Sequence, residues 1–423
     1  MRYLIFTVII SLLFVPVVLP NWHAAGAQKK EKPRKPKTRR SEVLSKQAFQ
    51  KVEQAQNLMS EEKYDAARVP LQAVIDGEKY KPYEKAVALQ TMGFAYAGQG
   101  DYRQTRRFFE RAIATGDLPP RVVNDLTYNL AQLSLADDDA PAALRLLEKW
   151  MAMIDNEPSG DAFALKAQIH LVMEDLPPAE QAIRKAISKS EAPKQTWVRI
   201  LLSVLLQQDR YSEARPVLEN AVSRWPNVKT FWKQLTAIYY EANEEKLAFV
   251  AQQAMFVQNM LATSKELSTM AQLYLYHNVP IKAALILQTG LDDGSIEKTE
   301  KNYELLAQSY MHAREWKKSV PPLMKAAEKS EKGKHYRQLG QSYLQDEEWS
   351  KASSAFEKAL EKGGLKDEAD SWLLLGITRT RLEKYEDAIK AFRKAGEDDD
   401  VAKDAYRWIR SIERRLAAQK AKS

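Results

Sequence analysis

The chain has 423 residues, of which 45% are hydrophobic and 28% are charged, an ordinary balance for a protein that buries a core. It contains no cysteine, which excludes a disulfide framework, a cysteine-ligated metal site and lipid attachment to an N-terminal cysteine. The formal net charge is +8, but Arg2 and residues 28–40 account for all of it, so the rest of the chain is neutral and a broad nucleic-acid-binding surface is not expected.

The first 27 residues have the layout of a secretory signal peptide. Arg2 precedes an apolar run over residues 3–19, and Ala25-Gly26-Ala27 supplies the small residues of a cleavage site. We expect cleavage after Ala27, with an uncleaved membrane anchor as the alternative. No later stretch approaches the ~18 consecutive apolar residues that a membrane-spanning helix requires.

Residues 28–43 are expected to form a disordered linker that is rich in Lys and Pro. Such a composition cannot bury apolar surface. The linker either solubilises the chain next to the cleavage site, or its basic residues 28–40 make a weak electrostatic contact with anionic lipid or an acidic partner.

From residue 44 to residue 400 the sequence repeats itself at intervals of 33 to 38 residues. A small residue recurs ten times, and the residue four positions later is apolar in all repeats except the sixth, where it is Gln252. The small residues are Ala67, Thr105, Ala143, Ala179, Ala214, Ala248, Ala283, Ser319, Ala352 and Ala388. An aromatic residue stands three positions before the small one in six repeats: Tyr64, Tyr102, Tyr211, Trp316, Trp349 and Tyr385.

This pattern predicts helical hairpins that are too small to bury their own apolar faces and therefore stack on their neighbours. The small residue is expected where the two helices of a hairpin cross closely, and the apolar residue four positions later lies on the same helix face. The aromatic residue is expected to pack back over the hairpin turn. Repeat four departs from the pattern at Lys166, and repeat six departs from it at Thr236, Gln252 and Met255.

The spacing resembles that of the tetratricopeptide repeat (TPR), whose period is about 34 residues. The resemblance is clearest in the tenth repeat, which contains Trp372, Leu375, Gly376, Tyr385, Ala388, Phe392 and Ala395. It implies an all-α solenoid of about ten helical hairpins over residues 44–400, coiled into a right-handed superhelix. Residues 401–423 place Tyr406, Ile409, Ile412 and Leu416 at helical spacing, which is typical of a C-terminal capping helix.

The order of features is also similar to that of the periplasmic TPR proteins that accompany the TonB–ExbB–ExbD energy-transducing complex in Gram-negative bacteria. Those features are a signal peptide, a Lys/Pro-rich stretch and then TPR units. The resemblance implies a periplasmic location and an accessory role in energised uptake through outer-membrane receptors.

The sequence carries no recognisable catalytic, metal-binding or cofactor-binding motif. Its histidines after the signal peptide include no pair at the i, i+4 spacing of a helical metal site, and His170 is expected to be a packing residue. The turn Asp292-Asp293-Gly294 lacks the alternating ligands of a calcium loop. We therefore predict a chain that is not an enzyme and that binds no cofactor, small-molecule substrate or nucleic acid.

A groove lined by the first helix of each hairpin is the remaining candidate for function, since such surfaces bind extended or helical peptides. One groove position carries glutamine in six repeats: Gln56, Gln132, Gln168, Gln272, Gln308 and Gln341. The same face is predicted to include Tyr128, Arg199, Lys233, Tyr240, Lys265, Tyr276, Glu304 and Arg337. The glutamines either bind a peptide main chain or simply favour helix at a half-exposed site.

The sequence as a whole favours a periplasmic scaffold or adaptor that binds envelope proteins in its groove, with a possible accessory role in TonB-dependent transport. Two alternatives stay open. One is a scaffold for peptidoglycan or outer-membrane assembly, and the other is a glycan-processing enzyme with an unrecognised pair of carboxylates.

Overall fold

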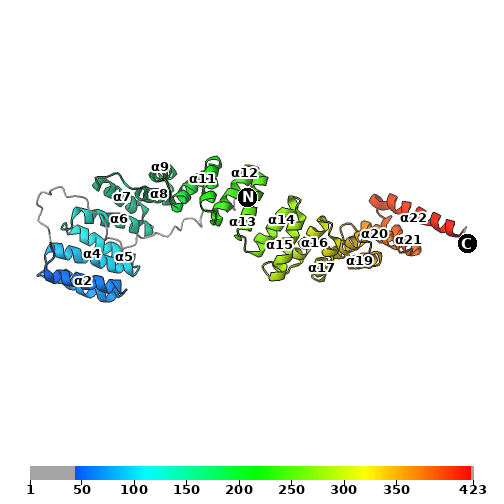
Figure 1. Ribbon diagram of the computed structural model, residues 1–423, viewed down its shortest axis with the longest axis horizontal. Helices are drawn as coiled ribbons and strands as arrows, with labels where there is room; N and C mark the ends of the chain where they lie inside the picture. The colour runs from blue at the N-terminus through cyan, green and yellow to red at the C-terminus, as the bar shows by residue number, and fades with distance from the viewer. Residues whose placement is uncertain (1–42, 421–423) are drawn as a thin grey trace. The chain divides into compact units, whose positions relative to one another are not determined.

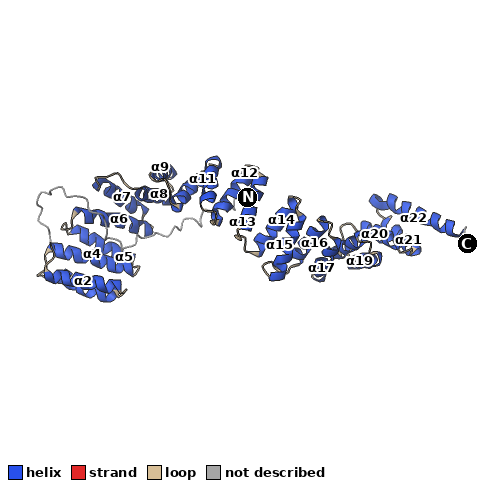
Figure 2. Cartoon of the chain, viewed as in Figure 1, coloured by secondary structure: helices blue, strands red, loops and turns tan. Residues whose placement is uncertain are grey.

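The computed structural model describes residues 43–420, and within that range the chain forms 21 helices, α2 to α22, and no strand (Figure 2). The signal peptide predicted for residues 1–27 lies outside the described residues, and so does the predicted linker except for Val43. The all-α fold predicted from the repeat is confirmed for the described part of the chain.

The chain divides into two compact units, with the boundary between Trp225 and Pro226. The N-terminal unit contains α2 (Lys46–Ser60), α3 (Tyr64–Asp76), α4 (Pro82–Gly98), α5 (Tyr102–Ala114), α6 (Pro120–Ala136), α7 (Ala140–Met153), α8 (Gly160–Val172), α9 (Leu176–Ser188), α10 (Gln195–Gln207) and α11 (Tyr211–Arg224). The C-terminal unit contains α12 (Lys229–Glu241), α13 (Glu245–Val257), α14 (Ser264–Tyr276), α15 (Pro280–Asp293), α16 (Glu300–His312), α17 (Trp316–Glu328), α18 (Lys334–Gln345), α19 (Trp349–Lys362), α20 (Glu368–Arg381), α21 (Tyr385–Ala395) and α22 (Asp399–Lys420).

Consecutive helices pair as hairpins, which we number 1 to 10 in chain order from α2–α3 to α20–α21. The first helix of a hairpin is its A helix and the second is its B helix. Within each unit every hairpin packs against the hairpins before and after it (Figure 1). This nearest-neighbour stacking is the arrangement of a TPR solenoid.

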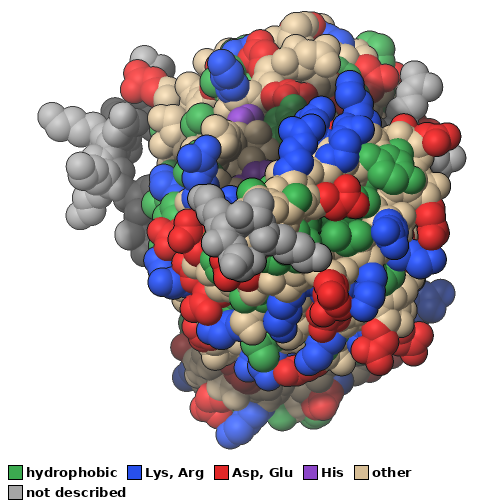
Figure 3. Space-filling view, turned by 90° about the vertical axis from the view of Figure 1, so that its right-hand side faces the viewer, with side chains coloured by type: hydrophobic (Ala, Val, Ile, Leu, Met, Phe, Trp, Pro, Cys, Tyr) green, Lys and Arg blue, Asp and Glu red, His purple; other side chains and the backbone are tan. Residues whose placement is uncertain are grey.

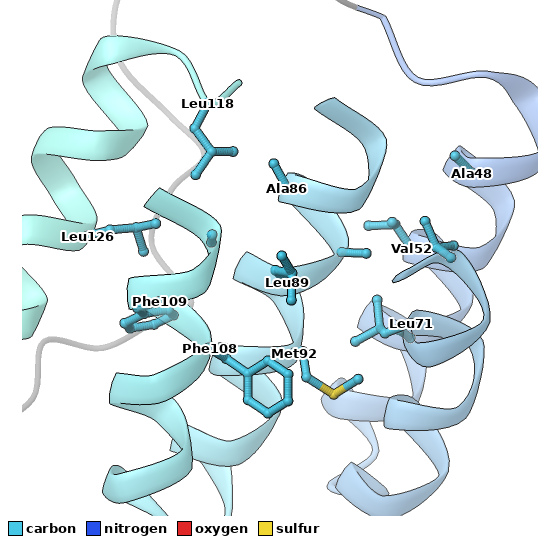
Figure 4. Packing of buried hydrophobic residues seen from close by; sticks show 14 of the residues in the cluster. Ala48, Val52, Leu71, Ala86, Leu89, Met92, Phe108, Phe109, Leu118 and Leu126 are labelled. Carbon is cyan, nitrogen blue, oxygen red and sulfur yellow. The ribbon is translucent and has the colours of Figure 1, made fainter. Parts of the chain in front are cut away.

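The helix crossing inside each hairpin is built on the predicted small residue. All ten of these residues, from Ala67 to Ala388, are 0% exposed. The apolar residue four positions later is also 0% exposed in nine hairpins, and only Gln252 of hairpin 6 is half-buried. In the N-terminal unit, Leu71 and Phe109 are two of these residues, and Met92 packs in the same core (Figure 4).

The turn between the two helices is the same in all ten hairpins. Its residue five positions before the small one has a left-handed backbone, with φ between 53° and 78°. The N–H of the next residue donates to the carbonyl five residues back at 2.7–3.0 Å, the hydrogen bond of a Schellman motif. In hairpin 3 the turn residue Asp139 caps α7, because its Oδ1 accepts from the backbone N–H of Ala142.

The recurring aromatic residue also packs against the following hairpin, a contact that the sequence did not suggest. It is the first residue of its B helix, and the ring of Tyr64 lies against Gly98, at the C-terminal end of the next A helix. Trp349 likewise has the guanidinium of Arg381, from the end of α20, 5.5 Å from its ring centroid. The hydroxyl of Tyr211 does reach back to its own turn, donating to Asp209 Oδ1 at 2.6 Å, and the start of the B helix lies beside the following hairpin as well.

The C-terminal helix α22 packs on hairpin 10. It begins at Asp399, two residues before the predicted boundary of the capping helix. Its Ala405, Ile409 and Ile412 are buried against Phe392 of α21, while its opposite side is exposed.

Ala388→Trp should strain the crossing in hairpin 10, since its Cβ has no exposed surface. We expect a loss of about 1–3 kcal/mol in the free energy of unfolding, with hydrogen exchange rising first in α20, α21 and α22. Glu386→Trp, at an exposed position of the same helix, is the matched control and should change little. Equal deprotection of all hairpins would contradict nearest-neighbour stacking.

Candidate peptide-binding site

The predicted groove residues all lie on A helices, but the structure divides them between the two units. Five belong to the N-terminal unit: Gln56, Gln132, Gln168, Tyr128 and Arg199. Nine belong to the C-terminal unit: Lys233, Tyr240, Lys265, Gln272, Tyr276, Glu304, Gln308, Arg337 and Gln341. We treat them as two separate sets.

The six glutamines follow directly after the small residue of their A helices, so they share one position on the hairpin. Gln56 and Gln272 are exposed, and the other four are half-buried. The Oε1 atom of Gln132 is buried and has no hydrogen-bond partner within the described chain. The amide groups of this position therefore differ in how freely they can reach a ligand.

In the N-terminal unit, Tyr128 is largely occupied by packing. Its ring lies 4.7 Å from that of Trp150, centroid to centroid. Burial, reinforced by the negative charge of Asp161, raises the pKa of Tyr128 to about 12. Arg199 is half-buried on α10. Tyr128 and Arg199 therefore contribute mainly to the interior of the N-terminal unit.

In the C-terminal unit, salt bridges connect the N-terminal ends of α12 and α14. Glu266 Oε1 lies 2.7 Å from Lys229 Nζ and 3.2 Å from Lys233 Nζ. Burial alone would raise the pKa of Glu266, but hydrogen bonds from Lys229, the Ala262 N–H and Lys233 outweigh it and lower this pKa to about 2. Lys265, which precedes Glu266 in the sequence, is exposed.

Similar contacts join the later A helices of this unit. Glu304 accepts a hydrogen bond from Gln308 Nε2 at 3.0 Å and pairs with Lys334 of α18. Arg337 Nη2 lies 3.8 Å from Asp370 Oδ2 of α20. Most of the predicted charged groove residues therefore link one hairpin to the next, and only part of their charge is available to a partner.

Two predicted tyrosines come together where α12, α13 and α14 meet. The hydroxyl of Tyr276 donates to Glu245 Oε2 at 3.0 Å, and the hydroxyl of Tyr240 accepts from Gln252 Nε2 at 3.1 Å. The hydrogen bond to Glu245 raises the pKa of Tyr276. Burial raises the pKa of Tyr240, against the opposing hydrogen bond from Gln252. We call Tyr240, Glu245, Gln252 and Tyr276 the Tyr–Glu cluster.

Sequence reasoning did not find Glu245. The available signal was its position, three residues before Ala248, where six repeats carry an aromatic residue. Gln252 was recognised only as a departure from the repeat, but the structure shows that its amide binds the hydroxyl of Tyr240. His170, predicted to be a packing residue, is indeed buried.

Other kinds of site are not evident in the described residues. No group of three His, Cys, Asp or Glu side chains between residues 43 and 420 could hold a metal ion. None of the helices in that range is long and apolar enough to cross a membrane. A shallow depression of about 370 Å³ lies along α2, lined by Gln50, Glu53, Gln54, Asn57, Leu58 and Glu61, and it includes none of the predicted groove residues.

The salt bridge at Glu266 gives a pH-dependent stability. On folding, the pKa of Glu266 falls from the ordinary 4.5 to about 2. The ionised carboxylate therefore stabilises the fold above pH 4.5, and this stabilisation is lost as the pH falls toward 2. Between about pH 5.5 and pH 3, the wild-type free energy of unfolding should drop by roughly 1–2 kcal/mol more than that of Glu266→Gln. Urea denaturation at the two pH values measures this difference. Glu413→Gln, on the exposed side of α22, should behave like the wild type, and parallel curves for Glu266→Gln would contradict the prediction.

Comparisons with known proteins agree with the repeat. Residues 337–402 match the family described as tetratricopeptide repeat. A search of curated protein sequences found no match. Similar solved structures include a tetratricopeptide repeat protein from Parabacteroides merdae, which has 15% identity and a TM-score of 0.42 and covers 63% of this chain and 99% of that chain.

Two further similar structures are a MamA chain from Desulfovibrio magneticus and YrrB, described as a TPR protein with an unusual peptide-binding site. The MamA chain has 18% identity and a TM-score of 0.38 over 44% of this chain and 99% of that chain. YrrB has 16% identity and a TM-score of 0.34 over 43% of this chain and 91% of that chain. Residues 337–402 match the repeat family, and the other hairpins share the same helix crossing and turn, so the described residues have the fold of a TPR solenoid.

Proposed function

We propose that this chain is a non-catalytic scaffold that binds a segment of another protein on the A-helix face of its hairpins. The observation that carries the proposal is the exposure of Gln272 and Tyr276 on one A helix, next to the paired Tyr240. The A helices keep such exposed side chains beside the buried residues of the crossings. A solenoid of this kind binds proteins through such an extended surface.

The binding mode follows from the side chains. A glutamine amide offers both a donor and an acceptor, which suits the main chain of an extended peptide. The tyrosines add apolar contact area with a polar tip. Charges of both signs are interspersed on the surface seen from the C-terminal end (Figure 3), which favours a partner recognised by local contacts over one drawn by a broad field.

We further propose that the partner is an envelope protein and that the chain acts in the periplasm, as an accessory to TonB-dependent transport. The support for this location is the signal-peptide layout of residues 1–27 and the resemblance of the feature order to TonB-associated TPR proteins. A scaffold for peptidoglycan or outer-membrane assembly is the alternative that the same experiment tests.

Cross-linking in living cells, followed by purification of the tagged full chain and identification of its partners, distinguishes these roles. Recovery of TonB, ExbB, ExbD or an outer-membrane receptor supports the transport role. Recovery of cell-wall or outer-membrane assembly proteins supports the alternative. Exclusive recovery of cytoplasmic proteins would overturn the proposed location.

Processing provides an independent prediction. Mass spectrometry of the chain purified from its native cells should show an N-terminus at Gln28, because cleavage is expected after Ala27. A chain that starts at Met1 and is found in the membrane fraction would instead indicate a membrane anchor.

The triple variant Gln272→Ala/Gln308→Ala/Gln341→Ala should weaken partner binding by about 1.5–4.5 kcal/mol, since each neutral hydrogen bond contributes about 0.5–1.5 kcal/mol. The melting temperature should change little, because Ala favours helix at least as well as Gln. Binding of the identified partner is measured by calorimetry. Gln258→Ala/Gln288→Ala, at the C-terminal cap of α13 and on α15, is the control, and unchanged affinity of the triple variant would make the glutamines a solvated face only.

A further inference from the structure

We propose that the Tyr–Glu cluster at the junction of α12, α13 and α14 binds a Lys or Arg side chain of the partner protein. The cation would lie over the exposed ring of Tyr276 and against the carboxylate of Glu245. This proposal rests on the function proposed above and names the chemistry of the segment that is bound.

Two departures from the repeat meet in the Tyr–Glu cluster. Glu245 takes a position that is aromatic in six repeats, and Gln252 takes a position that is apolar in the nine others. Each of the two side chains makes a hydrogen bond to a tyrosine of an A helix, Glu245 to Tyr276 and Gln252 to Tyr240. Departures from a locally consistent pattern are expected at functional sites.

The packing of one hairpin on the next explains only part of the Tyr–Glu cluster. In hairpin 9 the start of the B helix supplies an aromatic ring, Trp349, and the end of the next A helix supplies the polar Arg381. At hairpin 6 the polarity is reversed, with the carboxylate on the B helix and the ring on the next A helix. The reversed contact satisfies the hydroxyl of Tyr276 but leaves the side chain 70% exposed. The contact between hairpins therefore accounts for the hydroxyl but does not bury the ring.

The ring of Tyr276 is held in place without being covered. Its hydroxyl is fixed on Glu245, and His277 contacts it edge to face with centroids 5.1 Å apart. His277 is itself stacked on Phe249 at 4.0 Å. A ring that is already oriented loses little conformational entropy when a ligand binds.

Acidic residues surround Glu245 in the sequence. The turn from α12 to α13 contains Glu241, Glu244 and Glu245 against the single cation Lys246. Glu241 and Glu245 are exposed. A carboxylate of a partner would be repelled here, and an apolar side chain would desolvate Glu245 without compensation. A cation gains both the carboxylate and the aromatic face.

The chain already uses this contact internally. The guanidinium of Arg68 lies 4.5 Å from the ring centroid of Tyr96, and Lys185 Nζ lies 4.5 Å from that of Phe163. No Lys or Arg between residues 43 and 420 lies over Tyr276 in this way. The ring of Tyr276 therefore presents to a partner the face that other rings present to their own chain.

The test measures binding of a fluorescent peptide, acetyl-Ser-Gly-Arg-Ser-Gly-Arg-Ser-Gly-Arg-Gly, to the full mature chain by fluorescence anisotropy. A peptide with citrulline in place of each arginine keeps the shape and removes the charge. We expect the arginine peptide to bind more tightly. Glu245→Gln and Tyr276→Leu should each weaken it by about two- to fivefold. The double variant should weaken it at least as much as the stronger single variant, and the two effects are not expected to multiply, because the two side chains are in contact. Tyr276→Phe keeps the ring and should stay within about twofold of the wild type.

The control is Glu348→Gln, at the turn of hairpin 9, where the next A helix ends in Arg381 and not in a tyrosine; it should leave the affinity unchanged. Equal affinity of the wild type and the double variant would overturn the proposal, and so would a loss in Tyr276→Phe as large as that in Tyr276→Leu. Binding that appears only after the basic residues of 28–40 are changed to Gln would assign the cluster to that segment of the chain. If the affinity for the arginine peptide is the same in all these variants but partner capture still depends on the A-helix glutamines, only the cation site is rejected. If partner capture does not depend on the glutamines either, the scaffold function is rejected as well.

Discussion

The close crossing of the two helices in each hairpin is the constraint on which the rest of the structure depends. In three hairpins the A helix meets this constraint with glycine. A Cβ added to Gly93, Gly340 or Gly376 would lie 2.5–2.6 Å from the ring of Phe109, Phe356 or Phe392, closer than any van der Waals contact allows. The large ring on the B helix and the missing side chain on the A helix are therefore parts of one fit, and interiors packed to this density tolerate no extra carbon without movement.

Both helices of a hairpin contribute to this packing, and the A helices also carry polar side chains that join one hairpin to the next. In the C-terminal unit they are joined by charged pairs such as Glu266 with Lys229 and by the buried His335, whose Nε2 lies 2.9 Å from Glu300 Oε1. These contacts fix each hairpin relative to the next. The Tyr–Glu cluster is the place where this face becomes both aromatic and acidic, and it coincides with the repeat whose sequence follows the pattern least well.

The fold could be predicted from the sequence because its determinants are local and periodic. The ten small residues and nine apolar partners are all buried as the spacing required, since both depend only on positions within one hairpin. The contacts across hairpins could not be predicted in the same way. The ring of Tyr64 meets Gly98 of the following repeat, and the partner of such a residue depends on how far the next hairpin is rotated, which no single period encodes.

The candidate site was predictable only in part for the same reason. The period placed Tyr240 and Tyr276 on A helices, but not the carboxylate that binds one of them, because Glu245 belongs to the intervening B helix. The division of the chain at Trp225 and Pro226 was also not visible in the repeat, since the spacing between Ala214 and Ala248 is ordinary. A period shows which residues are equivalent, and it says nothing about where a chain divides into compact units.

The left-handed turn residue offers a means of engineering the molecule. Only one of the ten hairpins has glycine there, Gly100, and the others use residues such as Glu174, Arg314 and Glu383, whose side chains make this conformation unfavourable by about 1–2 kcal/mol. A Cβ at Gly100 would have no atom within 4 Å, so the space around that turn is open. Thermal resistance could therefore be adjusted one hairpin at a time through these tips, with glycine or asparagine, while both the packed crossings and the A-helix face keep their chemistry.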